Sequence, residues 1–524
     1  MATEKGNSYD QVPYESNAFR DSHPDNLATM ANLFGMSPAP MNNCRVLELG
    51  CASGGNIIPL AVQFPKSSFT GIDLSSVQIA EGDALIKKLK LKNIKLLHQS
   101  ILDVEKQEYD FIVCHGVYSW VPDAVKEKIM AICGEQLAPQ GVAYISYNTY
   151  PGWHFRGMIR DMMIYHTKHL TDPKTKVFQA RALLDFLAQS APAETAYGKM
   201  LKDEANLLRQ HKDSYLLHEH LEEANHPLYF HEFAERADEL GLRYLGESAF
   251  SVMMTSNFSK QVTETLKQVA NDIIRTEQYM DFLRNRTFRQ TLLCRKDIPL
   301  KRNLSPDDMT RFFIGSSAKP VPADGGAGEN ANKPEKFATP TGASITPGHP
   351  LTKAAFHHLA QTWPQSAAFD TLLEEAAKRG GLPWDKDNAA TYRKVLSADM
   401  LTALTAGLIE LRLTQLDFVT RVSDKPVASE LAREQATKGR QVTNQRHEPT
   451  NLDDVNQHLI KLLDGKTDRA AMLDALLKLV ANGALRANQQ DGKTITDDAA
   501  LRTLFTRAID IGLGNLAKSA LLVG

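Results

Sequence analysis

The sequence predicts an α/β fold in which a parallel sheet is joined to a helical insertion and a mostly helical C-terminal region. Three observations lead to this prediction. Short apolar runs alternate with helical stretches between residues 45 and 148, as in parallel sheets with crossover helices. Helical periodicity then dominates residues 157–239 before two more strand-like runs. After residue 350 helical periodicity returns.

The expected elements follow from their residue patterns. Strands are predicted where short apolar runs end at small or polar residues, at 45–51, 68–74, 94–100, 109–116 and 141–148. Helical spacing is found at 54–64, 75–91 and 123–136. We expect the runs 242–250 and 287–295 to complete the sheet as its last pair of strands. The helices that precede them would then be an insertion into the fold.

The chain divides into five expected parts. They are an N-terminal lid segment (1–43), a core (44–156), a helical insertion with the last strands (157–315), a flexible linker (316–350) and a C-terminal domain (351–524). The linker is rich in Pro, Gly, Ala and Ser, and such a segment buries too little apolar surface to offset its ordering entropy. In the C-terminal part, Asp468 is the expected N-cap of a helix over 469–483.

Composition excludes several classes of protein. The formal charge is −2, from 60 basic and 62 acidic residues, which gives no general attraction to nucleic acid or anionic membrane. No apolar run approaches the roughly 20 residues that span a bilayer, and the N-terminus lacks the apolar core of a signal peptide. The five cysteines are an odd number without a CxxC pair, which favours a reducing compartment. We therefore expect a cytoplasmic protein without nucleic-acid or membrane partners.

The strongest local signal is the segment from Glu48 to Asn56, ELGCASGGN, which follows a strand and opens a helix. Gly50 permits a sharp turn, and the missing side chains let the backbone approach a nucleotide closely. Free N–H groups at the start of the helix can then meet polar groups of the ligand.

Two further features fall at the ends of the next strands. Asp73 ends the second strand, where a carboxylate can accept hydrogen bonds from both ribose hydroxyls. Ser100 and Ile101 end the third strand and are expected to border an adenine. All lie at carboxyl ends of strands, where open α/β sheets bind ligands.

A glycine-rich turn alone is weak evidence, because it also occurs without a ligand or in dinucleotide-binding sites. Glu48 separates these alternatives, since a carboxylate there repels a pyrophosphate but suits the cationic ammonium and sulfonium of S-adenosylmethionine. The predicted cofactor is therefore S-adenosylmethionine. Its expected contacts are Glu48, Gly50, Cys51, Ala52, Ser53, Gly54, Asn56, Asp73, Leu74, Ser100, Ile101 and His115.

ELGCASGGN followed by GIDLS resembles the first two motifs of class I S-adenosylmethionine-dependent methyltransferases. The resemblance implies a Rossmann-like, seven-stranded sheet. Two positions depart from the family pattern. Ala52 replaces the middle glycine of the first motif, and Ser100 stands where many relatives have an aspartate that binds the adenine amino group. That contact would then come from Asp103 or a backbone group.

A wider resemblance extends over nearly the whole chain. Residues 8–36, 147–163 and 217–247 resemble bacterial methyltransferases with a methyltransferase regulatory domain. Residues 425–448 and 463–473 resemble the C-terminal, winged-helix-like domain of rickettsial protein-lysine methyltransferases, which modify an outer-membrane protein. The resemblance implies a protein substrate that presents lysine, such as an outer-membrane or surface protein.

Aromatic residues cluster after the fourth and fifth expected strands. We predict that an acceptor channel for a neutral amine is lined by Tyr118, Trp120, Tyr150 and Trp153, with Tyr14 and Asn148 orienting the reacting groups. A partly apolar, aromatic channel lowers the pKa of an amine and attracts its charged forms. The alternative is that these aromatic residues simply pack the domain junction. His115 is expected to line the cofactor rather than to act as a general base.

Other readings remain open from the sequence. His218, His220, His226 and His231 lack metal-site spacing, so no metal is predicted. The favoured function is a protein-lysine methyltransferase whose C-terminal domain presents the substrate. The alternatives are a small-molecule methyltransferase and a non-catalytic module that binds S-adenosylmethionine. Because the C-terminal helices lack an obvious basic recognition helix, we expect them to dock substrate or to form a homodimer.

Overall fold

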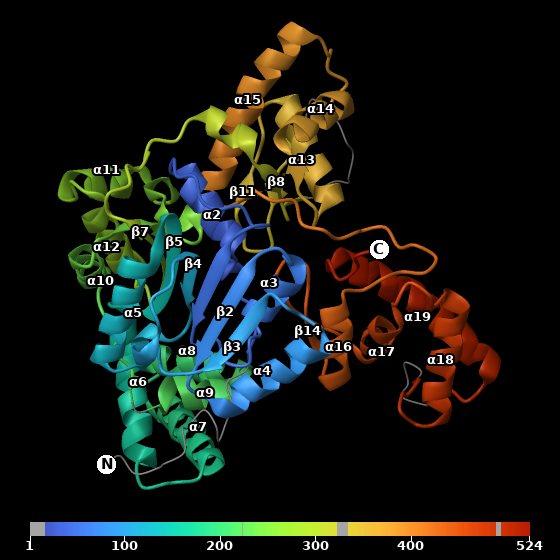
Figure 1. The fold of residues 1–524 in the computed structure, drawn as a ribbon, viewed down its shortest axis with the longest axis horizontal. Helices are drawn as coiled ribbons and strands as arrows, with labels where there is room; N and C mark the ends of the chain where they lie inside the picture. The colour runs from blue at the N-terminus through green and yellow to red at the C-terminus, as the bar shows by residue number, and fades with distance from the viewer. Residues whose placement is uncertain (1–15, 223, 322–333, 489–493) are drawn as a thin grey trace. The chain divides into compact units, whose positions relative to one another are not determined.

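The computed structural model describes residues 16–222, 224–321, 334–488 and 494–524. The chain forms two compact units, which Figure 1 shows as a ribbon. The first comprises Met1–Ser16, Met30–Ile58 and Lys66–Leu300, and the second comprises Asn17–Thr29, Pro59–Pro65 and Lys301–Gly524. Each unit has its own hydrophobic core. In the described residues, no helix combines the length and the apolar character that crossing a membrane requires.

The first unit is built on a seven-stranded sheet. Neighbouring strands from β3 to β5 are parallel, whereas β7 runs antiparallel to both β5 and β6. This arrangement confirms the predicted Rossmann-like methyltransferase sheet, including its last pair of strands. The spatial order is β3 (Ile94–His98), β2 (Ser68–Asp73), β1 (Arg45–Leu49), β4 (Tyr109–Cys114), β5 (Leu137–Asn148), β7 (Phe288–Arg295) and β6 (Leu242–Glu247).

Helices pack on the sheet through their apolar faces. Ile129 and Cys133 of α5 (Asp123–Gln136) share a core with Phe233 of α10 (Phe230–Glu239) and with Ile112 and Ile145 of the sheet. The helix α4 (Ser76–Lys88) packs on β2 and β3. The remaining helices around the sheet are α3 (Ile57–Gln63), α11 (Lys260–Val269) and α12 (Ile273–Arg284).

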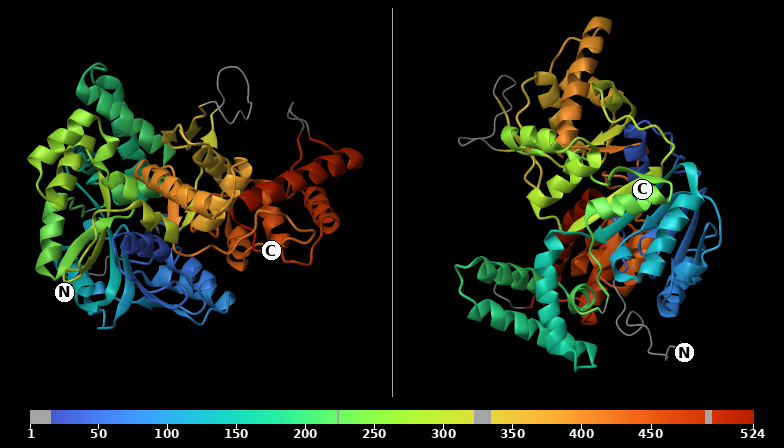
Figure 2. Two further views of the ribbon diagram at one scale, coloured as in Figure 1. Left: turned by 90° about the horizontal axis from the view of Figure 1, so that it is seen from above. Right: turned by 90° about the vertical axis from the view of Figure 1, so that its left-hand side faces the viewer.

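The helical insertion has a core of its own. Ile159, Val177, Leu201 and Leu216, one from each of its four helices, are all buried in that core. In the right-hand view of Figure 2, these helices form a bundle that projects from the sheet. They are α6 (Gly152–Thr167), α7 (Pro173–Ser190), α8 (Ala196–Gln210) and α9 (Asp213–His220). Because α6 begins at Gly152, the insertion starts five residues before the predicted boundary at 157.

Part of the expected N-terminal lid is instead a packed helix. In α2 (Pro24–Leu33), Leu27 and Ala31 are completely buried. The predicted lid therefore does not extend over these residues, because their apolar side chains are used in packing. Tyr14 and the rest of 1–15 lie outside the described residues.

Charged side chains fix residues 17–29 within the second unit. Arg20 contacts Glu410, and Nη1 of Arg446 lies 2.8 Å from Oε1 of the same carboxylate. Although Glu410 is largely buried, these arginines hold its pKa well below the usual range for a carboxyl group. The side chain of Glu448 also contacts Arg20, so residues distant in sequence share one ion network.

The prediction of a flexible linker at 316–350 is wrong for the described residues, 316–321 and 334–350. Phe337 is completely buried, with its ring centroid 5.4 Å from that of Phe356. Glu335 lies 3.0 Å from the ammonium of Lys353. A few apolar and charged residues thus pack this segment, although its overall composition is typical of a flexible linker. The short strands here are β9 (Lys319–Pro320), β10 (Phe337–Ala338) and β11 (Ser344–Ile345).

The region predicted as one C-terminal domain forms two packed parts. Helices α13 (Pro350–Thr362), α14 (Phe369–Arg379) and α15 (Lys386–Thr405) pack on one another. A separate core runs from Ala428 to Leu522. It holds a hairpin of β14 (Gln441–Thr443) and β15 (Pro449–Asn451) among the helices α16 (Glu430–Lys438), α17 (Asp454–Leu462), α18 (Arg469–Ala481) and α19 (Asp498–Lys518). As predicted, Asp468 caps α18, accepting a hydrogen bond from the N–H of Ala471.

Candidate cofactor and acceptor site

The glycine turn after β1 adopts the conformation that a nucleotide-binding turn needs. Gly50 has φ of 77°, Ala52 of 50° and Gly54 of 78°. Such positive values suit glycine, and only a few per cent of other residues adopt them. A Cβ atom on Gly50 would lie 2.3 Å from Cγ2 of Val117 in the connection after β4. The turn and that connection are therefore in close contact, and Ala52 follows the glycine-like path of the family motif.

Asp73 lies against the same turn. One carboxylate oxygen accepts a hydrogen bond from the N–H of Ala52 at 2.8 Å, and the other accepts one from Ser75 at 2.9 Å. Each oxygen keeps a second lone pair, so the carboxylate can still receive ribose hydroxyls. The N–H groups of Gly50 and Cys51 both donate to the carbonyl of Ile72. The structure thus brings the glycine turn and Asp73 to one edge of the sheet.

Glu48 is the acidic residue at the head of the turn. Its side chain is buried, and Oε1 accepts a hydrogen bond from Nδ2 of Asn56 at 2.7 Å. Its Oε2 is buried without a hydrogen-bond partner in the described part of the chain. Burial raises the pKa of this carboxyl group to about 8, with a smaller contribution from Asp73. An unsatisfied buried acceptor beside the turn fits the cationic ammonium of S-adenosylmethionine.

This carboxyl group predicts a pH dependence of cofactor binding. Because its pKa is raised in the folded state, the cofactor-free protein loses stability as pH rises from about 4.5 through about 8. A bound ammonium offsets that loss. The increase in Tm caused by S-adenosylhomocysteine, which carries the same ammonium, should therefore grow as pH rises through 8. We expect Glu48→Gln to flatten this profile, and an unchanged profile in that variant would refute the role of Glu48.

The other predicted cofactor contacts surround the turn. The N–H of Gln99 donates to the carbonyl of Asp73 at 3.0 Å, which holds the end of β3 beside Asp73. Ser100 uses its hydroxyl to cap the short helix Ile101–Asp103. Ile101 is half-buried and Leu74 is 61% exposed, so both have apolar surface available to an adenine. Cys51 is buried against Gly71, and burial raises the pKa of its thiol, which disfavours the reactive thiolate.

His115 follows β4, two residues before Val117. Its Nδ1 lies 2.8 Å from the hydroxyl of Tyr144, and Nε2 of Gln290 donates to that hydroxyl at 3.0 Å. Burial lowers the pKa of His115 to about 4, so the imidazole is neutral at physiological pH. A group with this pKa is a poor general base, and contact of His115 with the cofactor stays a prediction. Sequence reasoning missed Tyr144 and Gln290, although the two-residue alternation of β5 places Tyr144 on the face of Ser146 and Asn148.

The predicted acceptor residues do not share one environment. Tyr118 is 1% exposed, and its ring packs on Tyr147 and Phe233 in the core of the sheet. This placement corrects the prediction that Tyr118 lines a channel, because its side chain is enclosed in the hydrophobic core. Trp153 is also buried, and Trp120 lies edge-on to it at 6.3 Å.

Asn148 and Tyr150 lie at the carboxyl end of β5. The N–H of Asn148 donates to the hydroxyl of Ser119 at 2.8 Å, and its Nδ2 donates to Oδ1 of Asn225 at 3.1 Å. Asn148 is therefore fixed in place next to the connection after β4. Asn225 was missed because 77 residues separate it from its partner, and only the fold brings the two together.

In the histidine-rich stretch, His218 and His220 lie beside carboxylates. His220 is fully buried, with Nε2 3.3 Å from a carboxylate oxygen of Glu204, and His218 lies near Glu222. Across residues 16–222, 224–321, 334–488 and 494–524, no three His, Cys, Asp or Glu side chains gather as metal ligands would.

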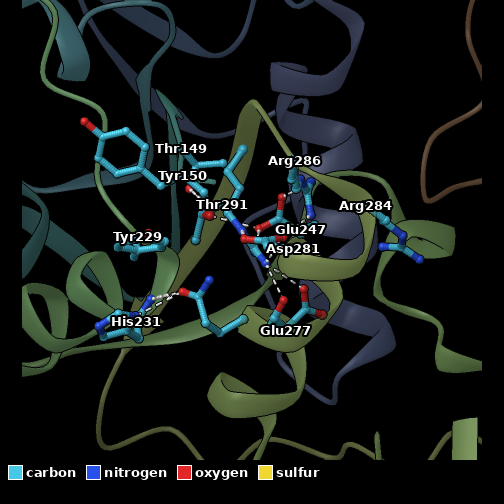
Figure 3. Close-up of polar contacts among 12 residues, drawn as sticks. Thr149, Tyr150, Tyr229, His231, Glu247, Glu277, Asp281, Arg284, Arg286 and Thr291 are labelled. Carbon is cyan, nitrogen blue, oxygen red and sulfur yellow. Dashed lines mark hydrogen bonds and ion pairs between the residues drawn. The ribbon is translucent and has the colours of Figure 1, made fainter. Parts of the chain in front are cut away.

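A buried ion network adjoins the acceptor end, as Figure 3 shows. Arg289, completely buried on β7, contacts Glu247 at 2.7 Å, Asp281 at 2.8 Å and Glu277 at 3.0 Å. Arg286 adds a contact of 2.7 Å with Glu247. The hydroxyl of Thr291 connects the network to β5, since it donates to Glu247 and also meets the hydroxyl of Tyr147.

The strand order, the carboxylate-headed glycine turn and Asp73 together define a class I S-adenosylmethionine-dependent methyltransferase. Comparisons with known families agree. Residues 40–211 match the family described as "Methyltransferase domain". Residues 212–295 match "Predicted methyltransferase regulatory domain", and residues 424–521 match "PKMT, C-terminal winged helix domain".

Two Rickettsia proteins resemble nearly the whole chain, and another resembles part of it. An uncharacterized protein of Rickettsia prowazekii is 37% identical over 99% of this chain and 94% of its own length. A second uncharacterized protein of that organism is 41% identical, over 45% of this chain and 96% of its own length. PKMT2 from Rickettsia typhi, solved in complex with AdoHcy, superposes with a TM-score of 0.88 at 31% identity, over 98% of this chain and 100% of its own. The chain belongs to this family of methyltransferases with a regulatory domain and a PKMT-type winged-helix domain.

Proposed function

We propose that this methyltransferase acts on lysine side chains of protein substrates. The observation that carries the proposal is similarity to Rickettsia typhi PKMT2 over 98% of this chain, together with the match of residues 424–521 to the family "PKMT, C-terminal winged helix domain". Because the similarity continues outside the methyltransferase domain, through residues 424–521, it supports the substrate class named for PKMT proteins over a small-molecule acceptor. The proposed acceptor is a surface or outer-membrane protein modified in the cytoplasm before export.

The residues at the carboxyl edge of the sheet suit this reaction. When bound, S-adenosylmethionine supplies a methyl group already activated by its sulfonium, so the protein must mainly align the acceptor and exclude water. Glu48 would hold the ammonium of the cofactor and Asp73 its ribose. Trp120 and Tyr150 offer aromatic faces to an approaching amine, and Asn148 offers a fixed amide that can accept a hydrogen bond from it.

The acceptor amine must arrive without a proton. Transfer into a partly apolar site lowers the pKa of a lysine ammonium because the charged form loses its hydration. His115 does not supply a base, since its imidazole already has a low pKa from burial. We therefore propose that desolvation at the aromatic entrance, with loss of the proton to water, generates the neutral amine.

Label transfer tests the proposed substrate class. The full chain is incubated with tritiated S-adenosylmethionine and a bacterial lysate, and the protein fraction is hydrolysed to amino acids. We expect the label in Nε-methyllysine, and we expect prior acetylation of the lysate lysines to abolish it. The Asp73→Ala variant serves as the control for background transfer. Label confined to small molecules, or to protein whose lysines are acetylated, would contradict the proposal.

A further inference from the structure

Five rings gather beside the carboxyl end of β5, and we call them the Tyr229 ring cluster: Tyr150, His154, Tyr229, His231 and Phe282. Tyr150 stacks on His154 with centroids 4.0 Å apart and lies 5.3 Å from Tyr229. The ring of His231 stacks on Tyr229 at 5.7 Å, and Phe282 meets Tyr229 edge-on at 6.0 Å. Nε2 of His154 is 3.1 Å from the hydroxyl of Tyr229. The segment after β5, the first turn of α6, the start of α10 and the end of α12 thus supply one aromatic surface.

This cluster is not part of the hydrophobic core. Phe282 is 47% exposed and His154 is exposed, whereas Tyr118, Tyr147 and Phe233 in the core are at most 1% exposed. Figure 3 shows Tyr150, Tyr229 and His231 beside the ion network of Glu247, Glu277 and Asp281. Exposed aromatic rings held in fixed positions are typical of binding surfaces, because they bury large areas at a small cost in conformational entropy.

The electrostatic surroundings of the cluster favour a cation. Burial raises the pKa of Tyr150, and the carboxylates of Glu232 and Asp161 raise it further through their negative charge. Glu232 is held in place because it accepts a hydrogen bond from the N–H of Tyr229 at 2.8 Å, and Asp161 is exposed.

The arginines that follow His154 and Phe282 along the chain are already engaged. Arg286 pairs with Glu247, and Arg156 lies 3.4 Å from Glu204. Arg160 donates to the carbonyl of Glu222. The aromatic faces are therefore bordered by carboxylates, while the neighbouring guanidinium groups have partners of their own.

We propose that the Tyr229 ring cluster binds a basic segment of the protein substrate, next to the lysine that is methylated, through contacts between its ammonium groups and the rings. The inference rests on the proposed function for its choice of occupant. Tyr150 follows Asn148 by two residues, so the cluster lies within reach of a chain whose acceptor lysine meets Asn148. Cations bind preferentially over aromatic faces, and carboxylates at the border add to the attraction.

Binding of a simple basic peptide tests this inference without any methyl transfer. A fluorescent lysine–glycine peptide is titrated with the full chain and followed by anisotropy, beside a matched glutamate–glycine peptide. We expect the lysine peptide alone to bind. Phe282→Leu retains apolar bulk but removes the ring, and we expect it to weaken binding about fivefold, while Phe282→Trp should match or exceed the wild type. Leu283→Ala is the control, because Leu283 is the next residue and is similarly exposed, at 53%.

The outcomes separate this inference from the proposed function. Equal binding by Phe282→Leu and the wild type, equal loss in Leu283→Ala, or no binding of the lysine peptide would each overturn it. Unchanged affinity for S-adenosylhomocysteine shows that every variant is folded. If methyllysine forms but the Phe282→Leu variant binds the lysine peptide as tightly as the wild type, only the inference fails. If the peptide binds through Phe282 while no methyllysine forms, only the proposed function fails.

Discussion

Asp73→Ala is expected to raise the Kd for S-adenosylhomocysteine by about two orders of magnitude, measured by calorimetric titration. The carboxylate has two tasks that alanine cannot perform. It receives the ribose hydroxyls, and it also fixes the N–H groups of Ala52 and Ser75. Hydrogen bonds to charged groups each contribute about 1.5–3 kcal/mol, so losing two accounts for the expected change.

Two further variants define the specificity of this effect. Asp73→Asn keeps the shape and one carbonyl oxygen, so we expect an intermediate affinity. Asp103→Ala removes an exposed carboxylate near the end of β3, and we expect little change unless Asp103 replaces the adenine contact that Ser100 cannot make. An Asp73→Ala protein that binds as tightly as the wild type would show that the nucleoside lies elsewhere.

Arg289→Met is expected to destabilise the first unit by about 3–5 kcal/mol, the usual cost of removing one partner from a buried ion network. The substitution leaves Glu247, Glu277 and Asp281 in the interior without the guanidinium that contacts all three. The free energy can be measured from the hydrogen exchange of β7 amides in denaturant, which reports on this unit alone.

The matched control for this variant lies on the same strand. Arg295 is 40% exposed and faces Asp297 at 3.7 Å, so Arg295→Met should cost less than about 1 kcal/mol. The loss in Arg289→Met should shrink at acid pH, because protonation removes the unpaired buried charges. Equal effects of the two substitutions would contradict the structural role of the network.

The elements that build the cofactor site are local, and this is why the sequence predicts them. Glu48, Gly50 and Asn56 lie within one turn, and Asp73 ends the next strand, so parallel strand order alone brings them together. Asp468 likewise caps its own helix. In each case the signal and the structure that it predicts span only a few residues.

Features that depend on distant pairs could not be predicted. Glu247 and Arg289 are 42 residues apart and meet only because β6 and β7 are neighbours. The position of Tyr118 in the connection after a strand predicted an exposed residue of a binding loop. In the structure, the packing of α10 on the sheet encloses it. The glycine- and proline-rich composition of 316–350 predicted a flexible segment. Phe337 is nevertheless buried there, in contact with Phe356, and the local sequence does not indicate this distant partner.

The most direct measurement of the central claim is a crystal structure of the full chain with S-adenosylhomocysteine. We predict that the ribose hydroxyls lie within hydrogen-bonding distance of the Asp73 carboxylate and that the ammonium lies beside Oε2 of Glu48. A nucleoside bound away from Asp73, or an ammonium that makes no contact with Glu48, would contradict the assignment of this site.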